Sequence, residues 1–320
     1  MFRRILLSFL LLLALSLASR AGSYLFYGEI QGIGGYSSAE HKGILHSGMK
    51  HDSMQKNSVG FDFIKTHSFL SLSLQFRLAY DDNKKHLQPQ IYNAYAKLSL
   101  PVGRVWLGHN RPAFGLNSYW DLHADLLGGL TMYGIGQELD WGLGYEKDTS
   151  WGDIRTALTL GSSMDARTQG NWAWSGRISY GILNQQNWNT GLSVWAGKPL
   201  EIMGYHVVNT HTQNTFLVGW DGALNCLNTE QKAQISVGKL YGEHTTSLLY
   251  RMTLGLDSEQ RWQAALQSII FHLPSQTQFI FGPQLSYQAS QTVTLRSAYQ
   301  RNTHTNDHRV LGQIYIYFLI

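Results

Sequence analysis

Cysteine and charged residues are both scarce in this chain of 320 residues. Cys226 is the only cysteine, so an intramolecular disulfide and a metal cluster built on thiolates are both excluded. Charged residues make up 14% of the sequence, whereas a soluble domain averages about 25%. The basic residues are scattered rather than gathered into a run, so no nucleic-acid partner is expected.

Long apolar runs are missing beyond the N-terminus. Arg3 and Arg4 precede an apolar run over residues 5–17 that ends in small residues, a pattern typical of a secretory signal peptide. The run is shorter than the roughly 20 residues that a spanning helix needs. We therefore predict that residues 1–21 are removed and that residues 22–320 form a single domain. Cleavage would lower the formal net charge from +4 to +1, because three arginines and no acid are lost.

Apolar and polar side chains alternate with period two along the rest of the chain. In residues 69–80, FLSLSLQFRLAY, every second residue from Leu70 to Tyr80 is leucine or aromatic, and the residues between them include Gln75 and Arg77. Residues 91–100, 172–182 and 248–256 repeat the pattern, and it places Tyr92 on the apolar face. No helix makes this pattern, so it predicts β-strands with one apolar face and one polar face.

Two kinds of break take turns between these strands. The short breaks lie at 66–68, 101–103, 148–152, 184–187, 228–231, 257–260 and 289–291. The breaks of the other kind, generally longer and more polar, lie at 41–57, 82–88, 115–137, 164–171, 200–212, 242–246, 273–277 and 301–308. Outer-membrane barrels have short periplasmic turns and long outer loops. The sequence therefore predicts an all-β fold, a transmembrane antiparallel β-barrel of about 16 strands, with about 14 or 18 as alternatives, and with both termini periplasmic.

Two segments resemble known outer-membrane proteins. The last residues, RVLGQIYIYFLI, resemble the closing strand that serves these proteins as an assembly signal, with Phe318 two residues before the end. Residues 103–116, GRVWLGHNRPAFGL, resemble the strand that leads into the third loop of bacterial outer-membrane porins, particularly the phosphate-selective type. The residues that carry this resemblance are Gly108, Arg111, Pro112, Phe114 and Gly115. The resemblance implies a pore that is narrowed by its third loop. Phosphate selectivity is not assigned, because the inward Arg and Lys residues do not form a run.

Charged residues on the polar phase are the candidate pore lining, because a charge in a barrel wall is costly toward lipid. The basic candidates are Arg77, Lys97, Arg104, Arg111, Arg155, Arg177, Arg251 and Arg296. The acidic candidates are Glu29, Asp62, Asp140, Glu146 and Asp221. A slight excess of bases predicts at most a mild preference for anions. The alternative is that these groups pair with one another and fill the barrel.

The longest loop, 115–137, is the candidate constriction. Its residues Asp121, His123 and Asp125 are expected to face Arg77, Lys97 and Arg111. A metal site at this D-x-H-x-D sequence would need a fourth ligand that the sequence does not supply, so neither a metal nor a cofactor is expected.

The pattern favours a passive channel for small hydrophilic solutes, but other functions are compatible with parts of it. Six inward aromatic residues would suit a sugar-permeating channel: Tyr27, Tyr95, Trp106, Trp195, Tyr315 and Tyr317. A non-conducting scaffold or a barrel that binds surface polysaccharide would share the same backbone features. An enzyme is not expected, because the sequence has no G-x-S-x-G motif and no facing Ser and His pair.

The expected partners follow from this interpretation. Outer-membrane lipid would surround the barrel, and lipopolysaccharide phosphates would meet basic loop residues, namely Lys42, Lys50, Arg301 and Arg309. A homotrimer is a further possibility that the resemblance to porins implies.

Overall fold

The computed structural model describes residues 22–47, 55–82, 85–203, 206–274 and 276–320. The predicted signal peptide, residues 1–21, and Lys50 therefore lie outside the described residues. Within the described ranges, sixteen long strands form one closed antiparallel barrel. They are β1 (Ser23–Ser37), β3 (Ser58–Thr66), β4 (Leu70–Asp81), β5 (His86–Leu100), β6 (Gly103–Asn110), β7 (Asp140–Asp148), β8 (Asp153–Thr159), β9 (Trp172–Tyr180), β10 (Trp188–Lys198), β13 (Thr215–Cys226), β14 (Thr229–Leu240), β15 (Glu243–Gly255), β16 (Trp262–Leu273), β17 (Gln276–Gln288), β18 (Val293–Asn302) and β19 (Asp307–Leu319).

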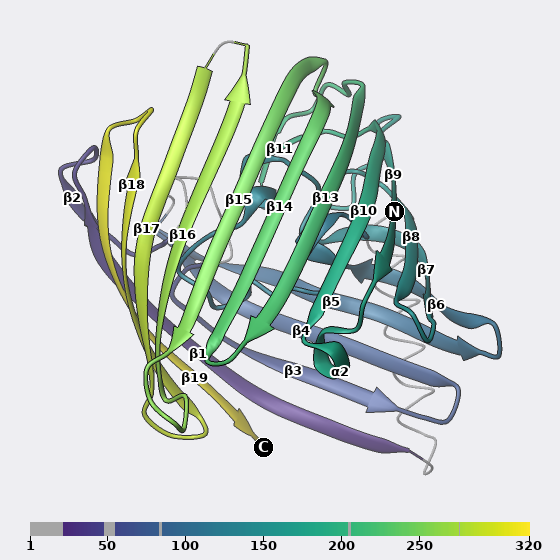
Figure 1. Cartoon of the computed structure of the whole chain (residues 1–320), viewed down its shortest axis with the longest axis horizontal. Coiled ribbons are helices and arrows are strands. Elements are labelled where there is room, and N and C mark those ends of the chain that lie inside the picture. The colour runs from purple at the N-terminus through teal and green to yellow at the C-terminus, as the bar shows by residue number, and fades with distance from the viewer. Residues whose placement is uncertain (1–21, 48–54, 83–84, 204–205, 275) are drawn as a thin grey trace.

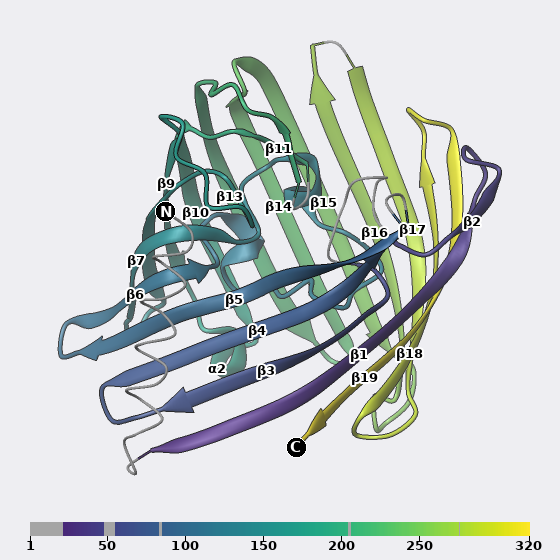
Figure 2. The ribbon, with the colours of Figure 1, turned by 180° about the vertical axis from the view of Figure 1, so that it is seen from behind.

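The barrel closes where the first strand meets the last. β1 pairs antiparallel with β19 from Tyr27 opposite Leu319 to Ser37 opposite Arg309, and with β3 on its other side. Every other wall strand pairs with its neighbours in sequence. Figures 1 and 2 show β1, β3, β4 and β5 crossing the molecule at a steep angle to β13–β16 on the opposite wall. Closure leaves no unpaired sheet edge, which a lipid environment requires of a β structure.

Shorter elements lie in the connections. β2 (Lys42–Ile44) pairs with the outer end of β1, and β11 (Glu201–Met203) pairs with β12 (His206–Asn209). The helical pieces are η1 (Gly115–Ser118), η2 (Leu130–Tyr133) and α2 (Leu183–Gln186). No helix of the described ranges has the length and apolar character that a membrane span would need.

The long and short connections lie at opposite ends of the barrel, as predicted. The seven short turns connect β3–β4, β5–β6, β7–β8, β9–β10, β13–β14, β15–β16 and β17–β18. The start of β1 pairs beside the β3–β4 turn, through Ser23 and Thr66, and the end of β19 lies beside it. In Figure 1 the C-terminus and α2 mark this end. The predicted strand count and the placement of the strand ends with the short turns are therefore confirmed.

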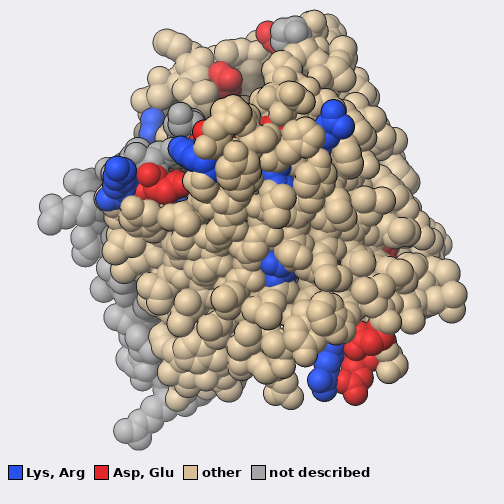
Figure 3. Space-filling view, turned by 90° about the vertical axis from the view of Figure 1, so that its left-hand side faces the viewer, with Lys and Arg blue, Asp and Glu red and all other residues tan. Residues whose placement is uncertain are grey.

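The strands present apolar side chains outward and polar side chains inward. In β9 the outward residues Trp172, Trp174, Ile178 and Tyr180 expose between 41% and 59% of their surface, whereas Arg177 is 2% exposed. In Figure 3 charged side chains gather near the upper and lower edges of the visible face, and most of the middle lacks them. This distribution is the one that a lipid-facing wall requires.

A β-bulge overturns the prediction for Tyr92. The register between β4 and β5 shifts at Gln75 and Phe76, so that Asn93 pairs with Gln75 and Ile91 pairs with Phe76 while Tyr92 has no partner. An extra residue in one strand reverses the inward and outward phase. Tyr92 consequently points into the barrel and is fully buried, although the alternation of residues 91–100 placed it on the lipid face.

Candidate functional site: the barrel interior

The long connection between β6 and β7, residues 111–139, folds into the barrel; we call it loop 3. Its apolar residues Phe114, Leu116, Leu130 and Ile135 form one cluster with inward residues of the wall. The wall residues of this cluster are Ala173, Trp195, Leu217, Leu240, Leu249, Ile269, Phe271 and Ile280. Leu126 and Leu127 form a second cluster against β1, β2, β18 and β19. Loop 3 therefore crosses the interior and is packed at both sides (Figure 2).

Polar wall residues bind the loop backbone. The N–H groups of Gly115 and Leu116 donate to Ser193 Oγ at 3.1 Å and to Gln234 Oε1 at 3.0 Å. Gly115 has φ of +58°, and a Cβ there would lie 2.4 Å from the Gln234 amide, so only glycine fits this approach. Gln267 Nε2 donates to the Gly128 carbonyl at 2.7 Å. These side-chain bonds satisfy backbone groups of loop 3 that take no part in the strand-to-strand hydrogen bonds of the barrel.

Asp121 of loop 3 faces Arg111. Arg111 Nη2 donates to Asp121 Oδ1 at 2.9 Å, and the Tyr92 hydroxyl donates to the same oxygen at 3.0 Å. The Asp121 side chain still exposes 59% of its surface. Burial within the barrel opposes its ionisation, but Arg111 and His123 outweigh this and hold the pKa of Asp121 well below its usual range. Asp121 is therefore a negative charge that remains open to solvent inside the barrel.

His123 connects loop 3 to β1 and β4. Its Nε2 lies 3.0 Å from Glu29 Oε1, and its ring also contacts the guanidinium of Arg77. Arg77 Nη2 lies 2.7 Å from the same Glu29 carboxylate. Glu29 and Arg77 are at most 1% exposed, so both point inward as predicted but are covered rather than open to the lumen. This group anchors the loop to the wall.

Asp125 pairs with Arg251 of β15 instead of with the residues predicted for it. The distance from Arg251 Nη1 to Asp125 Oδ2 is 2.7 Å. The neighbouring Trp120 ring lies 5.3 Å from the Arg251 guanidinium and 5.3 Å from the Lys232 ammonium. Cations over an aromatic face are attracted to its quadrupole. Trp120 and Lys232 were not identified from the sequence, and together with Asp125 they hold the loop against β14 and β15.

Arg177 and Asp221 form a pair that Tyr119 of loop 3 covers. Arg177 contacts both carboxylate oxygens, at 3.0 Å for Oδ2 and 2.7 Å for Oδ1, and both side chains have no exposed surface. The Tyr119 ring centroid lies 4.8 Å from the Arg177 guanidinium, and its hydroxyl donates to Asp221 at 3.2 Å. These two predicted lining residues are therefore inward but buried.

Four other predicted charges retain exposed surface, and three of them, Lys97, Glu146 and Arg155, line a cavity beside loop 3. Lys97 binds Glu146 at 3.0 Å, and Arg104 bridges Glu146 at 3.5 Å and Asp148 at 2.8 Å. Arg155 lies 3.3 Å from Asp153 and also donates to the Ser118 carbonyl. The exposed fractions are 22% for Lys97, 36% for Arg104, 25% for Arg155 and 13% for Glu146.

The remaining predicted charges have other partners. Arg296 donates to Gln313 at 2.8 Å, and Asp62 accepts from the Tyr317 hydroxyl at 3.0 Å. Asp140 departs from the prediction of a pore-lining acid. It has no exposed surface and accepts backbone N–H groups of Gly161 at 2.5 Å and Ser162 at 3.2 Å. At the outer end of β7 it stabilises the connection to β9 because its carboxylate satisfies these buried donors.

The six inward aromatic residues do not form a continuous exposed track. Trp106 and Trp195 are 2% and 1% exposed. Tyr27 stacks on Tyr317 with ring centroids 4.7 Å apart, and Tyr315 and Tyr317 are also stacked at 6.2 Å. Rings that stack on one another turn their faces toward each other, which leaves less ring face available to a sugar.

Asp121, His123 and Asp125 point toward three different parts of the wall, so their ligand atoms do not converge. Across the described ranges no group of three or more His, Cys, Asp or Glu side chains is arranged to hold a metal ion.

Two cavities lie beside loop 3 and share Arg155. The first has a volume of about 360 Å³ and is lined by Asn93, Lys97, Arg111, Asp121 and Glu146 among others. The second, of about 440 Å³, is lined by Tyr119 and by residues of the short turns at 148–153 and 181–185. Ser118 lines the first and Tyr119 lines the second, and the second reaches the end of the barrel that carries the short turns.

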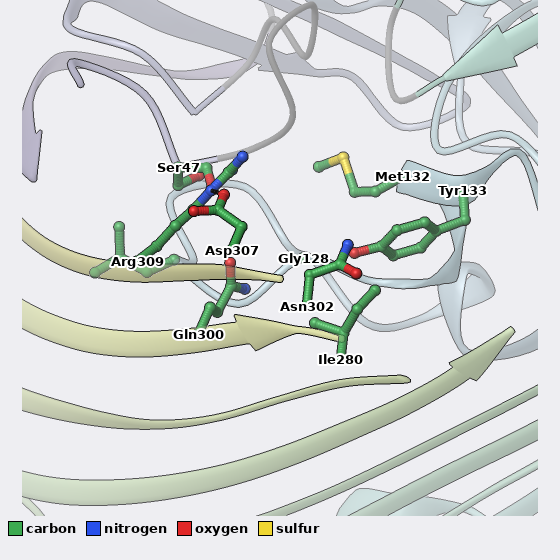
Figure 4. A pocket seen from close by; sticks show the side chains of 10 residues that line it. Ser47, Gly128, Met132, Tyr133, Ile280, Gln300, Asn302, Asp307 and Arg309 are labelled. Atoms are coloured by element: carbon green, nitrogen blue, oxygen red, sulfur yellow. Dashed lines mark hydrogen bonds and ion pairs between the residues drawn. The ribbon is translucent and has the colours of Figure 1, made fainter. Parts of the chain in front are cut away.

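A third, small cavity of about 50 Å³ lies between loop 3 and the outer ends of β17–β19. Figure 4 shows Met132 and Tyr133 of loop 3 on one side of it and the Asp307 and Arg309 pair on the other, with Asn302 between them.

The inward apolar residues that receive loop 3 leave a trace in the sequence. In β16 the consecutive residues Ile269, Ile270 and Phe271 are all apolar, and the first and third point inward while Ile270 is exposed. Alternation therefore fails locally where the loop packs on the wall. A search for strands with two apolar phases would have found this surface.

A closed sixteen-stranded antiparallel barrel with its third loop packed inside is the porin fold. Solved structures with which this chain shares it include an anion-selective porin from Comamonas acidovorans, with a TM-score of 0.68 at 12% sequence identity, covering 93% of this chain and 100% of that one. OmpF of Salmonella typhi in complex with daunomycin has a TM-score of 0.69 at 11% identity, with 93% and 98% covered. OmpT of Vibrio cholerae in a trimer form has a TM-score of 0.65 at 10% identity, with 93% and 100% covered. No protein-family model and no curated protein sequence matches the chain.

Proposed function

We propose that this chain is an outer-membrane porin, a passive diffusion channel for small hydrophilic solutes or ions with a mild preference for anions. The same proposal makes residues 115–137 of loop 3 the constriction of the channel. No reaction and no cofactor are part of it.

The observation that carries this proposal is the charged cavity beside the loop. Three bases, Lys97, Arg111 and Arg155, and two acids, Asp121 and Glu146, line a space of about 360 Å³. Side chains that keep exposed surface next to such a space can attract or repel a passing ion, whereas covered pairs such as Arg177 and Asp221 cannot. The excess of one base supports a weak anion preference.

The neighbouring solved structures support a channel. One of them is described as anion-selective, which agrees in sign with the charges around this cavity. The interpretation that charged pairs merely fill the barrel explains the buried pairs of Glu29 with Arg77 and of Arg177 with Asp221. It does not explain the two cavities that meet at Arg155.

The test is the conductance of the purified protein in a planar bilayer, with the reversal potential measured in a salt gradient. We expect ohmic single channels and a reversal potential that indicates a small excess of anion permeability. Absence of conductance would favour a scaffold, and saturable block by oligosaccharides would favour a sugar channel.

Three further parts of the proposal concern processing and partners. Residues 1–21 are removed by signal peptidase, which mass spectrometry of the mature protein tests. Lipopolysaccharide phosphates contact basic loop residues such as Lys42 and Arg301, and the barrel assembles as a homotrimer, as the trimer form of OmpT suggests. Native mass spectrometry from detergent would measure both the subunit number and any retained lipopolysaccharide.

A further inference from the structure

A fourth cavity lies at the outer end of the barrel, and none of its lining residues lines the two cavities that share Arg155. It has a volume of about 290 Å³. Its wall comes from loop 3, from β11, from the β14–β15 turn and from the outer ends of β16 and β17. The residues that give it chemical character are Tyr133, Glu201, Tyr241, Glu243, Phe271 and Gln278.

The floor of this outer cavity is apolar and aromatic. Phe271 is 4% exposed and belongs to the cluster that holds loop 3, and its ring centroid lies 6.2 Å from that of Tyr133. Tyr241 is fixed in place because its hydroxyl accepts the Ile202 N–H at 2.9 Å. Leu240 and Leu273 complete the floor. This surface suits the apolar or aromatic body of a small molecule.

The charged groups that line the outer cavity are both carboxylates. Within the described ranges, neither Glu201 nor Glu243 has a Lys, Arg or His nitrogen within the 4.0 Å of a salt bridge, and no basic residue lines the cavity. Tyr241, which also lines the cavity, is affected by Glu201: burial raises the pKa of Tyr241, and the Glu201 carboxylate raises it further.

Gln278 supplies an independent sign of a ligand. It is 8% exposed and lines the cavity, and its Oε1 has no hydrogen-bond partner among the described residues. A buried acceptor without a partner costs free energy, which a donor from a bound molecule would recover.

We propose that the outer cavity binds a small organic ammonium ion, a protonated primary amine carried on an apolar or aromatic body. The N–H groups of the ammonium supply donors to Gln278 Oε1, and its charge is balanced by Glu201 and Glu243. The aromatic rings favour the same ligand, since a cation close to a ring face is attracted to it. An anion of the same shape would meet two carboxylates and no base.

The experiment is isothermal titration calorimetry on the folded full-length mature protein in a non-ionic detergent. The probe is 2-phenylethylammonium, and the matched anion is 3-phenylpropionate. We expect saturable binding of the ammonium with one site per chain and no saturable binding of the anion. Calorimetry does not require ion conduction, so this proposal and the porin function can fail independently.

Variants distinguish the cavity from partition of the amine into the micelle. Glu201→Gln and Glu243→Gln each remove a negative charge, and Gln278→Leu removes a hydrogen-bond acceptor. Each should weaken binding about tenfold, within the range of one hydrogen bond to a charged group. Glu259→Gln is the control, because Glu259 is 64% exposed in the β15–β16 turn at the opposite end and pairs only with Arg261 among the described residues. Equal binding by all four variants, equal binding of the anion, or no saturable binding to the wild type would overturn the proposal.

Discussion

Arg177 in β9 extends across β10 and forms an ion pair with Asp221 in β13, and both side chains are fully buried beneath the Tyr119 ring. The strand between them carries Gly191, and a Cβ at this position would lie 2.6 Å from the Arg177 guanidinium. The absence of a side chain at Gly191 therefore lets one ion pair tie three wall strands and loop 3 together.

The change Gly191→Ala should displace the Arg177 guanidinium and destabilise the barrel by about 1–3 kcal/mol, the usual cost of overpacking. Denaturant unfolding in lipid bilayers, followed by tryptophan fluorescence, would measure this. Gly34→Ala is the matched control, because a Cβ at Gly34 meets no atom within 4 Å. Equal loss of stability in both variants would mean that Gly191 does not serve the ion pair.

The change Asp121→Asn should increase anion preference, because it removes a negative charge whose side chain is 59% exposed beside the cavity. The reversal potential in a salt gradient should move by several millivolts toward the anion value. Glu259→Gln, far from the lumen, should leave the reversal potential unchanged. If Asp121→Asn also leaves it unchanged, the ion path does not pass Asp121.

The opposite change in selectivity is expected from Lys97→Gln. This removes one of three bases around the cavity and leaves Glu146 with Arg104 as its partner at 3.5 Å. The cavity then has two bases and two acids, so the channel should lose its anion preference. Bi-ionic potentials would measure the change, and an increase in anion preference would contradict the proposed lining.

The effect of Asp121 should persist in mild acid. Arg111 and His123 hold the pKa of Asp121 well below its usual range, against the opposing effect of burial. An aspartate in an unfolded chain titrates near pH 4. The Asp121 carboxylate therefore keeps its charge and its full stabilising contribution at any pH above about 4. It loses both only as the pH falls through its lowered folded-state pKa. The difference in reversal potential between wild type and Asp121→Asn should therefore be the same at about pH 7 and pH 5. Its disappearance at the lower pH would refute this.

Loop 3 should loosen when Trp120 is changed to Ala. The substitution removes two cation–π contacts, to Lys232 and to Arg251, each of which contributes about 0.5–1 kcal/mol or more when desolvated. Single-channel recordings should show a larger mean conductance and more current noise. Trp151→Ala is the control, because Trp151 is an exposed residue of the β7–β8 turn. Unchanged recordings for Trp120→Ala would mean that the loop does not limit conduction.

The sequence by itself determined the barrel. Alternation is a local property of each strand, and the order of long and short breaks counts strands, so residues such as Ile178 and Arg177 in β9 could be assigned to opposite faces without coordinates. The approach of His123 to Arg77 and of Asp121 to Arg111 followed the same logic, because a long loop after the fifth strand of the barrel brought these charges to the same level.

Only the tertiary structure decided which charges stay open to water. The bulge at Tyr92 depends on the register between β4 and β5. Because of the bulge, the Tyr92 hydroxyl reaches Asp121, although the alternation of residues 91–100 places Tyr92 on the lipid face. Asp125 meets Arg251 because the loop crosses the whole interior, and Asp140 turns to backbone N–H groups that only the folded connection from β8 to β9 presents. Covalent order fixes which face a side chain uses except where a bulge shifts the phase, as at Tyr92. The partners of each side chain come from strands and loops far apart in the chain, so their distances are set only when the barrel closes.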